Sequence, residues 1–368
     1  MNNVTHGNVF KALEEWAPKK LAYDWDNVGL QVGSYTDKTK KILVTLDVLE
    51  SVVDEAIANE TNLIIAHHPL LFKGLKNIDF QSVKGKIIKK LIKHDITVYA
   101  AHTNLDIANG GVNDLLCEAL DLVSTKPLVD KQTEKILKLV VFVPVTHAEI
   151  VREALGNAGA GHIGAYSHCT FQSEGQGTFK PLEGTNPYIG KKNELEKVAE
   201  FKIETVVKET NLNQVINAMK KAHPYEEVAY DLYPLELAGD SFGLGRIGSF
   251  EEPMSLQSLC NKVKKAYQVN DLRVTGDLDQ PIKKVAIIGG SGEKYIYQAK
   301  RMGADAFITG DVTFHLAQDA KELGLAIIDP GHYIEQIMKK ATKKYLLNKF
   351  SNIQVLESKI DTDPFQFV

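Results

Sequence analysis

Residues 64–70 read Ile64-Ile65-Ala66-His67-His68-Pro69-Leu70, a short apolar run that ends in two adjacent histidines. Such a run is typical of a strand buried on both faces of a parallel sheet. Open α/β sheets carry their functional groups beyond the carboxyl ends of the strands, and Pro69 favours an extended or turning backbone there. His67 and His68 are therefore candidate ligands. The alternative is a histidine pair that only caps the strand and bonds to backbone.

A second strand of the same kind follows along the chain. Residues 96–101 are apolar and β-prone, and they lead into His102 and, four residues later, Asp106. Between the two strands, residues 83–93 place apolar side chains at helical spacing among lysines, which predicts a βαβ unit. Sequential parallel strands are usually neighbours, so we expect both strand ends to share one rim of the sheet.

A third strand end lies far along the chain. Residues 325–329 form another buried-strand pattern, followed by His332, Glu335 and a helical stretch through Leu347. A spacing of three residues places His332 and Glu335 on the same face of the first helical turn. This segment therefore adds an imidazole and a carboxylate of the kinds found at the first two strand ends.

Together the strand ends supply five imidazole and carboxylate groups: His67, His68, Asp106, His332 and Glu335. This mixture suits zinc, iron, manganese or nickel, and it contains too much nitrogen for magnesium or calcium. Five ligands exceed what one tetrahedral zinc ion needs, whereas two ions bridged by Glu335 or Asp106 would use them all. We therefore predict a dinuclear site with two divalent ions per chain, of which zinc, iron and manganese fit best.

A length of 368 residues indicates two or three domains. Residues 40–68 and 283–311 share the order strand, helix, strand, which we interpret as an internal duplication. Chance similarity between two βαβ units is the alternative. The predicted fold is α/β, with two related βα halves, residues 1–124 and 238–368, packed around the dinuclear site.

Residues 125–237 interrupt this βα rhythm. Their pattern predicts strands and helices in the order β-α-β-β-α-β, the split βαβ arrangement of an inserted ferredoxin-like α+β domain. The main expected elements are strand 137–144, helix 148–158, strand 203–208, helix 212–222 and strand 228–232. The motif His223-Pro224-Tyr225-Glu226-Glu227 contains acid, base and ligand types, but it also fits an exposed turn that docks a neighbouring subunit or domain.

Composition limits the class of protein. Hydrophobic residues make up 44% and charged residues 24% of the chain, as in soluble globular proteins. A formal net charge of -4 gives no general attraction to nucleic acid or membrane. No apolar stretch is long enough to span a bilayer, and residues 1–4 do not begin a signal peptide. Three widely spaced cysteines favour reduced thiols, so we expect a cytoplasmic protein.

Further residues leave two interpretations open. His102 is either a hydrogen-bonding partner or proton carrier beside the metals, or a structural residue. Asp311 and His315, one helical turn apart, form either a third metal site or an N-cap and an exposed histidine. The turn at residues 289–292 could hold a phosphate on backbone amides or be a plain tight turn, and it lacks the Lys-Ser/Thr ending of a P-loop.

Several motifs together resemble the GTP cyclohydrolase I type 2 homologues, also called the Nif-three-like family. These motifs are residues 24–33, 67–69, 102–106, 309–311 and 331–333. The resemblance covers essentially the whole chain, and the insert is similar to the PII/CutA-like domain of the longer bacterial members. It implies a two-metal centre on the five ligands given above, and a toroidal homohexamer built from trimers whose metal sites face an internal cavity. Many members place the glutamate four residues after the histidine, whereas Glu335 follows His332 by three.

Two metal ions at such a site favour a metal-dependent hydrolase that acts on a phosphoester or a ring C–N bond, and the family name adds GTP ring opening. The substrate would be a small molecule or nucleotide, and no catalytic residue is assigned. The alternative is a protein without turnover, which binds or delivers metal or regulates through the PII-like insert. A third class, nucleic-acid binding inside a ring, would need a basic lining that the net charge of -4 does not indicate.

Overall fold

The computed structural model describes residues 4–366, so residues 1–3, on which the expected lack of a signal peptide partly rests, lie outside it. The chain forms two compact units. Unit 1 contains the chain up to Gln132 and again from Phe242 onward, and unit 2 contains Thr133–Ser241. Within the described part of the chain, none of the helices has both the length and the apolar character to cross a membrane.

The first sheet of unit 1 has the strand order β1-β4-β3-β2-β13. Its strands are β1 (Gly29–Val32), β2 (Lys41–Thr45), β3 (Leu63–Ala66), β4 (Thr97–Ala100) and β13 (Gln354–Glu357). All neighbours are parallel except β1, which runs antiparallel to β4. Every residue of β3 and β4 is buried, as their continuous apolar sequence predicts.

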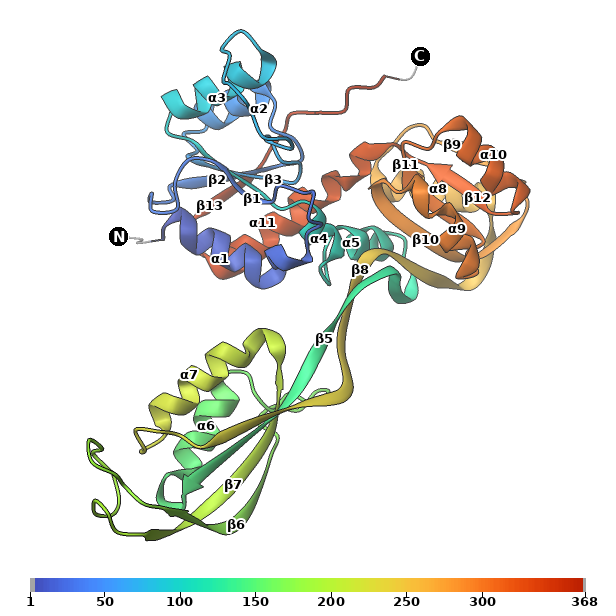
Figure 1. Ribbon diagram of the computed structural model, residues 1–368. Coiled ribbons are helices and arrows are strands. Elements are labelled where there is room, and N and C mark those ends of the chain that lie inside the picture. The colour runs from blue at the N-terminus through green and yellow to red at the C-terminus, as the bar shows by residue number, and fades with distance from the viewer. Residues whose placement is uncertain (1–3, 367–368) are drawn as a thin grey trace. The chain divides into compact units, whose positions relative to one another are not determined.

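Helices flank this sheet in the way that the βαβ pattern predicts (Figure 1). They are α1 (His6–Trp16), α2 (Glu50–Ala58), α3 (Val83–Lys93) and, from the far end of the chain, α11 (Ile337–Lys349), which packs on β2 and β13. After β4 the chain forms α4 (Thr103–Ile107) and α5 (Val112–Ala119). The helix expected over residues 83–93 is α3, and the Ser82 hydroxyl caps it by accepting the Gly85 N–H at 3.1 Å. Its apolar face, which includes Ile87 and Leu91, is buried against the sheet and α2.

The second sheet of unit 1 has the order β8-β10-β11-β12-β9. Its strands are the end of β8 (Tyr230–Ser255), β9 (Arg273–Thr275), β10 (Pro281–Ser291), β11 (Ala306–Gly310) and β12 (Ala326–Asp329). The helices beside it are α8 (Leu256–Tyr267), α9 (Ile296–Arg301) and α10 (Phe314–Glu322), and α5 packs against β10. Strands β10, β11 and β12 are parallel, as are β2, β3 and β4 in the first sheet. The duplication of the two halves stays a prediction.

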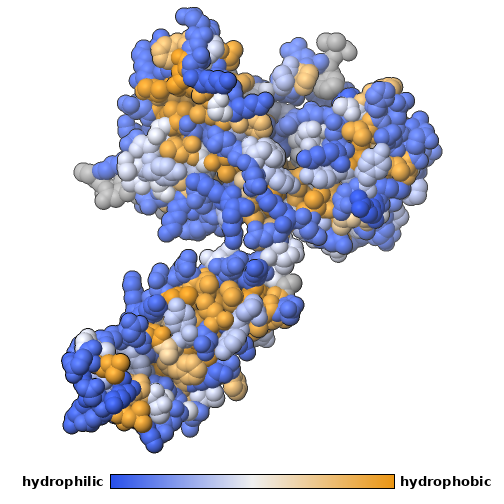
Figure 2. Space-filling model, viewed as in Figure 1, coloured by the Kyte–Doolittle hydropathy of each residue, from blue (hydrophilic) through white to orange (hydrophobic). Residues whose placement is uncertain are grey.

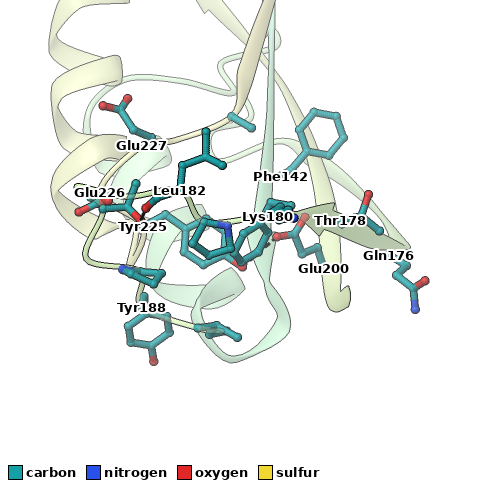
Figure 3. A pocket seen from close by; sticks show the side chains of 17 residues that line it. Phe142, Gln176, Thr178, Lys180, Leu182, Tyr188, Glu200, Tyr225, Glu226 and Glu227 are labelled. Carbon is teal, nitrogen blue, oxygen red and sulfur yellow. Dashed lines mark hydrogen bonds between the residues drawn. The ribbon is translucent and has the colours of Figure 1, made fainter. Parts of the chain in front are cut away.

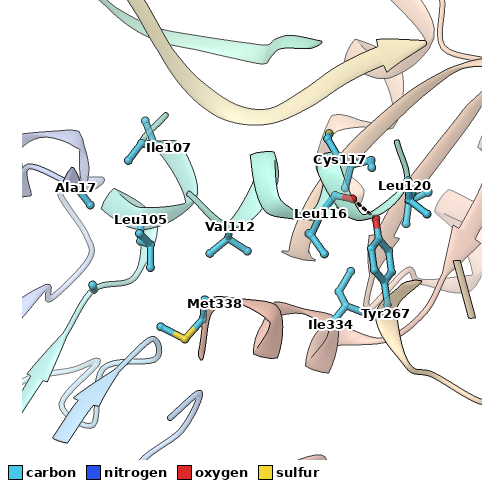
Figure 4. Packing of buried hydrophobic residues seen from close by; sticks show 14 of the residues in the cluster. Ala17, Leu105, Ile107, Val112, Leu116, Cys117, Leu120, Tyr267, Ile334 and Met338 are labelled. Atoms are coloured by element: carbon cyan, nitrogen blue, oxygen red, sulfur yellow. Dashed lines mark hydrogen bonds between the residues drawn. The ribbon is translucent and has the colours of Figure 1, made fainter. Parts of the chain in front are cut away.

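The core between the two sheets is built around α4, α5 and α11. Figure 4 shows Leu105 and Val112 on one side, with Ile334 and Met338 opposite, and these side chains belong to one buried cluster. The Tyr267 hydroxyl donates to the Leu116 carbonyl at 3.0 Å. This core fixes α4 and the segment before α11, the two elements that carry Asp106 and Glu335.

Unit 2 has the strand order β6-β7-β5-β8, the order of a ferredoxin-like split βαβ sheet. Its elements are β5 (Val123–Pro144), α6 (Ala148–Asn157), β6 (Thr170–Phe179), β7 (Glu196–Lys208), α7 (Leu212–Ala222) and the start of β8. Helices α6 and α7 pack on one face of the sheet over a buried apolar cluster (Figure 1), and apolar residues also reach the visible surface of this unit (Figure 2). The specific likeness to PII/CutA-like domains stays a prediction.

Strands β5 and β8 are much longer than the expected strands at 137–144 and 228–232. Both continue past the boundary of unit 2, and they are neighbours in the sheet. In the first half of β5, buried and exposed residues do not alternate regularly, because many of its residues are polar and they form no apolar face. Backbone pairing between the two strands stabilises this part, and apolar periodicity does not reveal such pairing.

Candidate metal centre

The two adjacent histidines follow directly after β3. The backbone N–H of His67 donates to the Thr45 carbonyl at 3.2 Å and that of His68 to the Leu46 carbonyl at 2.9 Å, so the chain stays paired with the β2 segment. The two imidazole rings nevertheless turn toward each other, with centroids 5.1 Å apart. His67 is fully buried, whereas 23% of the His68 side chain is exposed.

The ring of His67 is oriented by the backbone of the neighbouring strand end. Its Nδ1–H donates to the Ala101 carbonyl at 2.8 Å, which leaves Nε2 as the acceptor nitrogen. Among the described residues this buried Nε2 has no hydrogen-bond partner, and neither has Oδ1 of Asp106, which lies 3.4 Å away. Two buried polar atoms that face each other without a donor between them fit a bound cation.

Glu335 joins the two sides of the centre. Its Oε2 lies 3.0 Å from Nε2 of His68, 3.2 Å from Nε2 of His332 and 3.7 Å from Nε2 of His67. Only 4% of the Glu335 side chain is exposed. The five residues expected at the site, from both sheets of unit 1, therefore converge on one place.

Residues His332–Gln336 form a 3₁₀ helix, and α11 begins only at Ile337, so the expected regular helix from residue 332 is wrong in its first turn. Gly331, with φ of 83°, turns the chain before it. In a 3₁₀ helix, side chains three residues apart are eclipsed. The three-residue spacing of His332 and Glu335 thus brings both side chains to the centre. In an α-helix, residues three or four apart would share a face.

Three carboxylates orient the rings of the other histidines, on the side of each ring that faces away from the cluster. Each accepts a hydrogen bond from the Nδ1–H of one imidazole, in the pairs Asp47 with His68 at 2.7 Å, Asp26 with His102 at 2.9 Å and Asp311 with His332 at 2.6 Å. Such a partner fixes the tautomer and the ring orientation, so that Nε2 is the nitrogen left for a metal. Metal-ligating histidines in other proteins usually have the same support.

His102 belongs to the same cluster. One ring nitrogen each of His67, His68 and His102 lies within 4.8 Å of the others. Behind His102, the buried Asp26 carboxylate also accepts from the backbone N–H and the hydroxyl of Thr103. The hydrogen bond from His102 to Asp26 fits both interpretations given for His102, and the ring lies beside the candidate ligands.

Sequence reasoning did not identify Asp47, although it stands two residues after β2 just as His68 stands two residues after the neighbouring β3. The rule that polar groups gather at the carboxyl ends of parallel strands would have found it. Asp311 is not the expected N-cap of α10, because the helix begins at Phe314 after Thr313 and Asp311 accepts from His332. His315 is exposed, and its ring nitrogen lies 3.3 Å from Gln318 Oε1.

Neighbouring histidines and carboxylates shift one another's pKa values at the centre. Burial alone would lower the pKa of His68, but hydrogen bonds to Asp47 and Glu335 outweigh it and raise the pKa to about 10. Burial would likewise lower the pKa of His332, but hydrogen bonds to Glu335 and Asp311 outweigh it and raise the pKa to about 9. Burial and the Glu335 charge raise the pKa of Asp106, whereas hydrogen bonds from the histidines overcome burial and hold the pKa of Glu335 well below its usual range. Positive charge is therefore favoured beside Glu335.

A glycine turn forms one wall of the centre. Gly290 has φ of 61°, and a Cβ there would lie 2.6 Å from Glu335 Oε1 and 3.0 Å from His332 Nε2. The turn is fixed by Thr309, whose hydroxyl accepts the Gly292 N–H at 2.8 Å and donates to the Gly290 carbonyl at 3.2 Å. The absence of a side chain at Gly290 leaves room for the cluster, and the interpretation of the turn as a phosphate cradle stays a prediction.

The centre opens into a cavity of about 490 Å³. Aromatic side chains line much of it, namely Tyr23, Trp25, Phe72 and Tyr295. Tyr23 and Trp25 stack with ring centroids 5.6 Å apart, and Trp25 and Phe72 are about half exposed at 55% and 43%. Lys294 adds a cation to the lining. The cavity therefore offers flat apolar surfaces and a positive charge beside the imidazole and carboxylate cluster.

These residues form overlapping groups that could each hold an ion. His68, His332 and Glu335 make one group, and His67, Asp106 and Glu335 another, with ligand atoms of each within 4.8 Å of one another. The fold and the site thus define a class of α/β protein with a histidine and carboxylate cluster between two sheets that could hold metal ions. A family model described as Duf34/NIF3 (NGG1p interacting factor 3) matches residues 4–364, and the chain belongs to this family.

Relatives are similar to this chain over its full length. A Bacillus subtilis (strain 168) protein described as a GTP cyclohydrolase 1 type 2 homolog is 51% identical over 370 residues, covering 100% of this chain and 99% of its own. The solved Bacillus cereus protein related to NIF3 has 50% identity and a TM-score of 0.94, with 100% of both chains covered. A solved Staphylococcus aureus protein has 34% identity and a TM-score of 0.76 over 100% of both chains. The family resemblance seen in the sequence motifs is confirmed.

Proposed function

We propose that the protein binds two divalent metal ions per chain, zinc, iron or manganese, at this centre. One ion would be held by His68, His332 and Glu335, and the other by His67, Asp106 and Glu335, with Glu335 shared. The observation that carries the proposal is the pair of buried, unpartnered atoms, His67 Nε2 and Asp106 Oδ1, within the described residues. Imidazole with carboxylate is the donor set that these metals prefer.

We further propose that the protein is a metal-dependent hydrolase. Divalent ions held in this way would lower the pKa of a water molecule and polarise a substrate oxygen, which supports hydrolysis of a phosphoester or a ring C–N bond. The printed name of the relatives, GTP cyclohydrolase 1 type 2 homolog, agrees with a ring C–N bond in a nucleotide.

The chain's own residues would do the positioning. The half-exposed rings of Trp25 and Phe72 can stack on a planar substrate, and Lys294 can bind an anionic group. His102 lies in the cavity wall with its Nδ1 hydrogen-bonded to Asp26, and it can therefore hold or move a proton at its other nitrogen. Each role requires only residues that the cavity already contains.

Metal analysis tests the first part of the proposal. Protein purified without chelators should contain about two ions per chain, as a dinuclear site requires. In a His67→Ala, His68→Ala double variant the content should fall to near zero. The matched control is His94→Ala, His162→Ala, because both of these histidines are exposed. One ion per chain in the wild type, or equal metal in both double variants, would refute the dinuclear assignment.

Activity assays test the second part. The protein loaded with manganese, zinc, iron or cobalt should be incubated with phosphodiester, phosphomonoester and GTP substrates, and then with a cell metabolite extract. Turnover should disappear in the His67→Ala, His68→Ala variant and persist in the exposed-histidine control. Activity that survives in the first variant would come from a different site and would contradict the assignment.

A role in metal delivery is the second candidate, and it is favoured by the 40% exposure of the His332 side chain, which leaves one side of the centre open to exchange. In this case no substrate would be consumed, and bound metal would pass to an acceptor chelator within minutes. Slow release together with turnover would exclude delivery and support the hydrolase.

A further inference from the structure

Unit 2 contains a cavity of about 620 Å³, and its lining shares no residue with that of the cavity at the candidate metal centre. Figure 3 shows the side chains that line it. It lies between the end of β6, the loop of residues 180–189 and the turn after α7. Four aromatic side chains line it: Phe142, Phe179, Tyr188 and Tyr225. The ring centroids of Phe179 and Tyr225 are 5.6 Å apart, and those of Tyr188 and Tyr225 are 6.4 Å apart. The cavity is thus lined by aromatic rings, and the ring of Tyr225 lies next to those of Phe179 and Tyr188.

A buried carboxylate faces this enclosure. Glu200 is only 8% exposed, and its Oε1 accepts the Tyr225 hydroxyl at 3.0 Å. Among the described residues no donor is hydrogen-bonded to its Oε2. On the neighbouring strand, Gly177 leaves space for the carboxylate, since a Cβ there would lie 2.1 Å from Oε2. This oxygen is not among the buried unpartnered atoms, so it is accessible from the cavity and free to accept a hydrogen bond from a ligand there.

The motif at residues 223–227 builds one wall of the cavity. His223 is buried, donates from Nε2 to the Phe142 carbonyl at 2.9 Å, and accepts the Tyr225 N–H on Nδ1 at 3.1 Å. Burial lowers the pKa of His223, in agreement with a neutral ring that donates once and accepts once. The motif is therefore more than an exposed turn, because His223 positions two of the aromatic residues.

The charge of the lining favours a positive ligand. Three carboxylates, from Glu200, Glu226 and Glu227, share the cavity with a single ammonium group, that of Lys180. Glu226 accepts the Asn186 N–H at 3.1 Å and thereby ties the 180–189 loop to this wall. Glu200 remains the one carboxylate of the three that is buried. An anionic ligand would meet this buried negative charge, whereas a cation would neutralise it.

We propose that this cavity binds a small organic cation, an ammonium, amidinium or guanidinium group on an apolar body. The cation would bond to Glu200 Oε2 while its charge lies against the faces of Tyr225 and Tyr188, and the apolar body would fill the rest of the enclosure. Aromatic faces attract cations, and a mostly apolar cavity with a few convergent polar groups is the usual form of a small-molecule site.

Calorimetric titration of the full-length protein with benzamidinium tests the proposal. Benzamide is the control ligand, because it has nearly the same shape and no charge at neutral pH. Benzamidinium should bind at least about tenfold more tightly than benzamide, as a charge-assisted hydrogen bond to a buried carboxylate would give. Equal affinities, or no binding of benzamidinium up to millimolar concentration, would overturn the proposal.

Two variants locate the binding. Glu200→Gln keeps the shape and an acceptor for Tyr225, and should weaken benzamidinium binding about tenfold, while Glu174→Gln on the exposed face of β6 should leave it unchanged. If Glu200→Gln does not fold, Tyr188→Ala replaces it, since Tyr188 is 54% exposed. It should weaken binding about three- to fivefold, and Tyr188→Phe should restore it. Unchanged affinity in the folded variants would refute the site.

Discussion

At the candidate metal centre, the two ring nitrogens of each histidine have different partners. Each of His68, His102 and His332 presents one nitrogen toward the cluster and donates from the other to a carboxylate behind it. His67 does the same with a backbone carbonyl. The orientation of the cluster therefore depends on residues that would not touch a metal, since they fix the tautomer and spare the conformational entropy cost of ordering a rotating imidazole.

Asp47 offers the clearest test at this scale. Asp47→Asn keeps the size of the side chain but weakens the charge-assisted hydrogen bond to His68 Nδ1, and Thr362 can still donate to the remaining oxygen. We expect metal affinity to fall about 10- to 100-fold, measured by competition with a chromophoric chelator. Asp54→Asn, on the exposed side of α2, is the control. An affinity equal to wild type would show that Asp47 does not position the ligand.

Elements of the fold are held together by buried polar contacts as well as by the apolar core. Arg246 on β8 is 2% exposed, and its guanidinium bonds to both oxygens of Asp114 on α5, at 2.5 and 2.9 Å. It also donates to the carbonyls of Gly243 and Ala108. This contact ties the second sheet to the helix that follows Asp106, so it stabilises the frame of the centre.

Asp114→Ala would leave the buried guanidinium without its counter-charge. We expect the free energy of unfolding of unit 1 to fall by about 3–5 kcal/mol. Asp54→Ala removes an exposed partner of Lys90 and should cost no more than about 1 kcal/mol. Both tryptophans, Trp16 and Trp25, lie in unit 1, so tryptophan fluorescence during urea unfolding reports this unit alone. Similar losses in the two variants would contradict the special role of the buried pair.

The whole molecule combines two units with separate cores and separate candidate sites. The candidate metal centre lies in unit 1 and the aromatic cavity in unit 2. Because a ligand stabilises only the folded unit that binds it, the two sites can be distinguished by what each ligand stabilises.

Metal removal should therefore act on unit 1. After chelation and dialysis, we expect the Tm reported by tryptophan fluorescence to fall, by an amount that corresponds to about 2.7 kcal/mol for metal present at 100 times its Kd. The His67→Ala, His68→Ala variant should show no further fall on chelation. A Tm that does not respond to chelation in the wild type would argue against a tightly bound metal.

Assembly is a further property of the whole molecule. From the family resemblance we propose a homohexamer, a ring built from two trimers with the metal centres facing its interior. Sedimentation velocity at micromolar concentration should give a mass six times that of one chain. A monomer, dimer or trimer as the main species would refute this assembly.

Local pattern was sufficient for much of the fold. The apolar runs before His67, His102 and His332 form β3, β4 and β12, and the lysine-rich amphipathic segment forms α3. The sequence pattern did not predict the polar first half of β5, because backbone pairing and not an apolar face stabilises this part of the strand. It also failed at residues 332–336, where a 3₁₀ helix and an α-helix share the same short-range spacing.

By itself the sequence determined which residues stand at strand ends, and hence the candidate ligands, because strand burial and side-chain chemistry are local properties. Tertiary structure alone decided that Glu335 reaches His67 and His68, more than 260 residues away along the chain. It alone paired Asp47, Asp26 and Asp311 with their histidines, and it enclosed Glu200 among aromatic rings. These contacts depend on how sheets and helices pack, and packing brings together groups whose separation in sequence carries no signal of their distance in space.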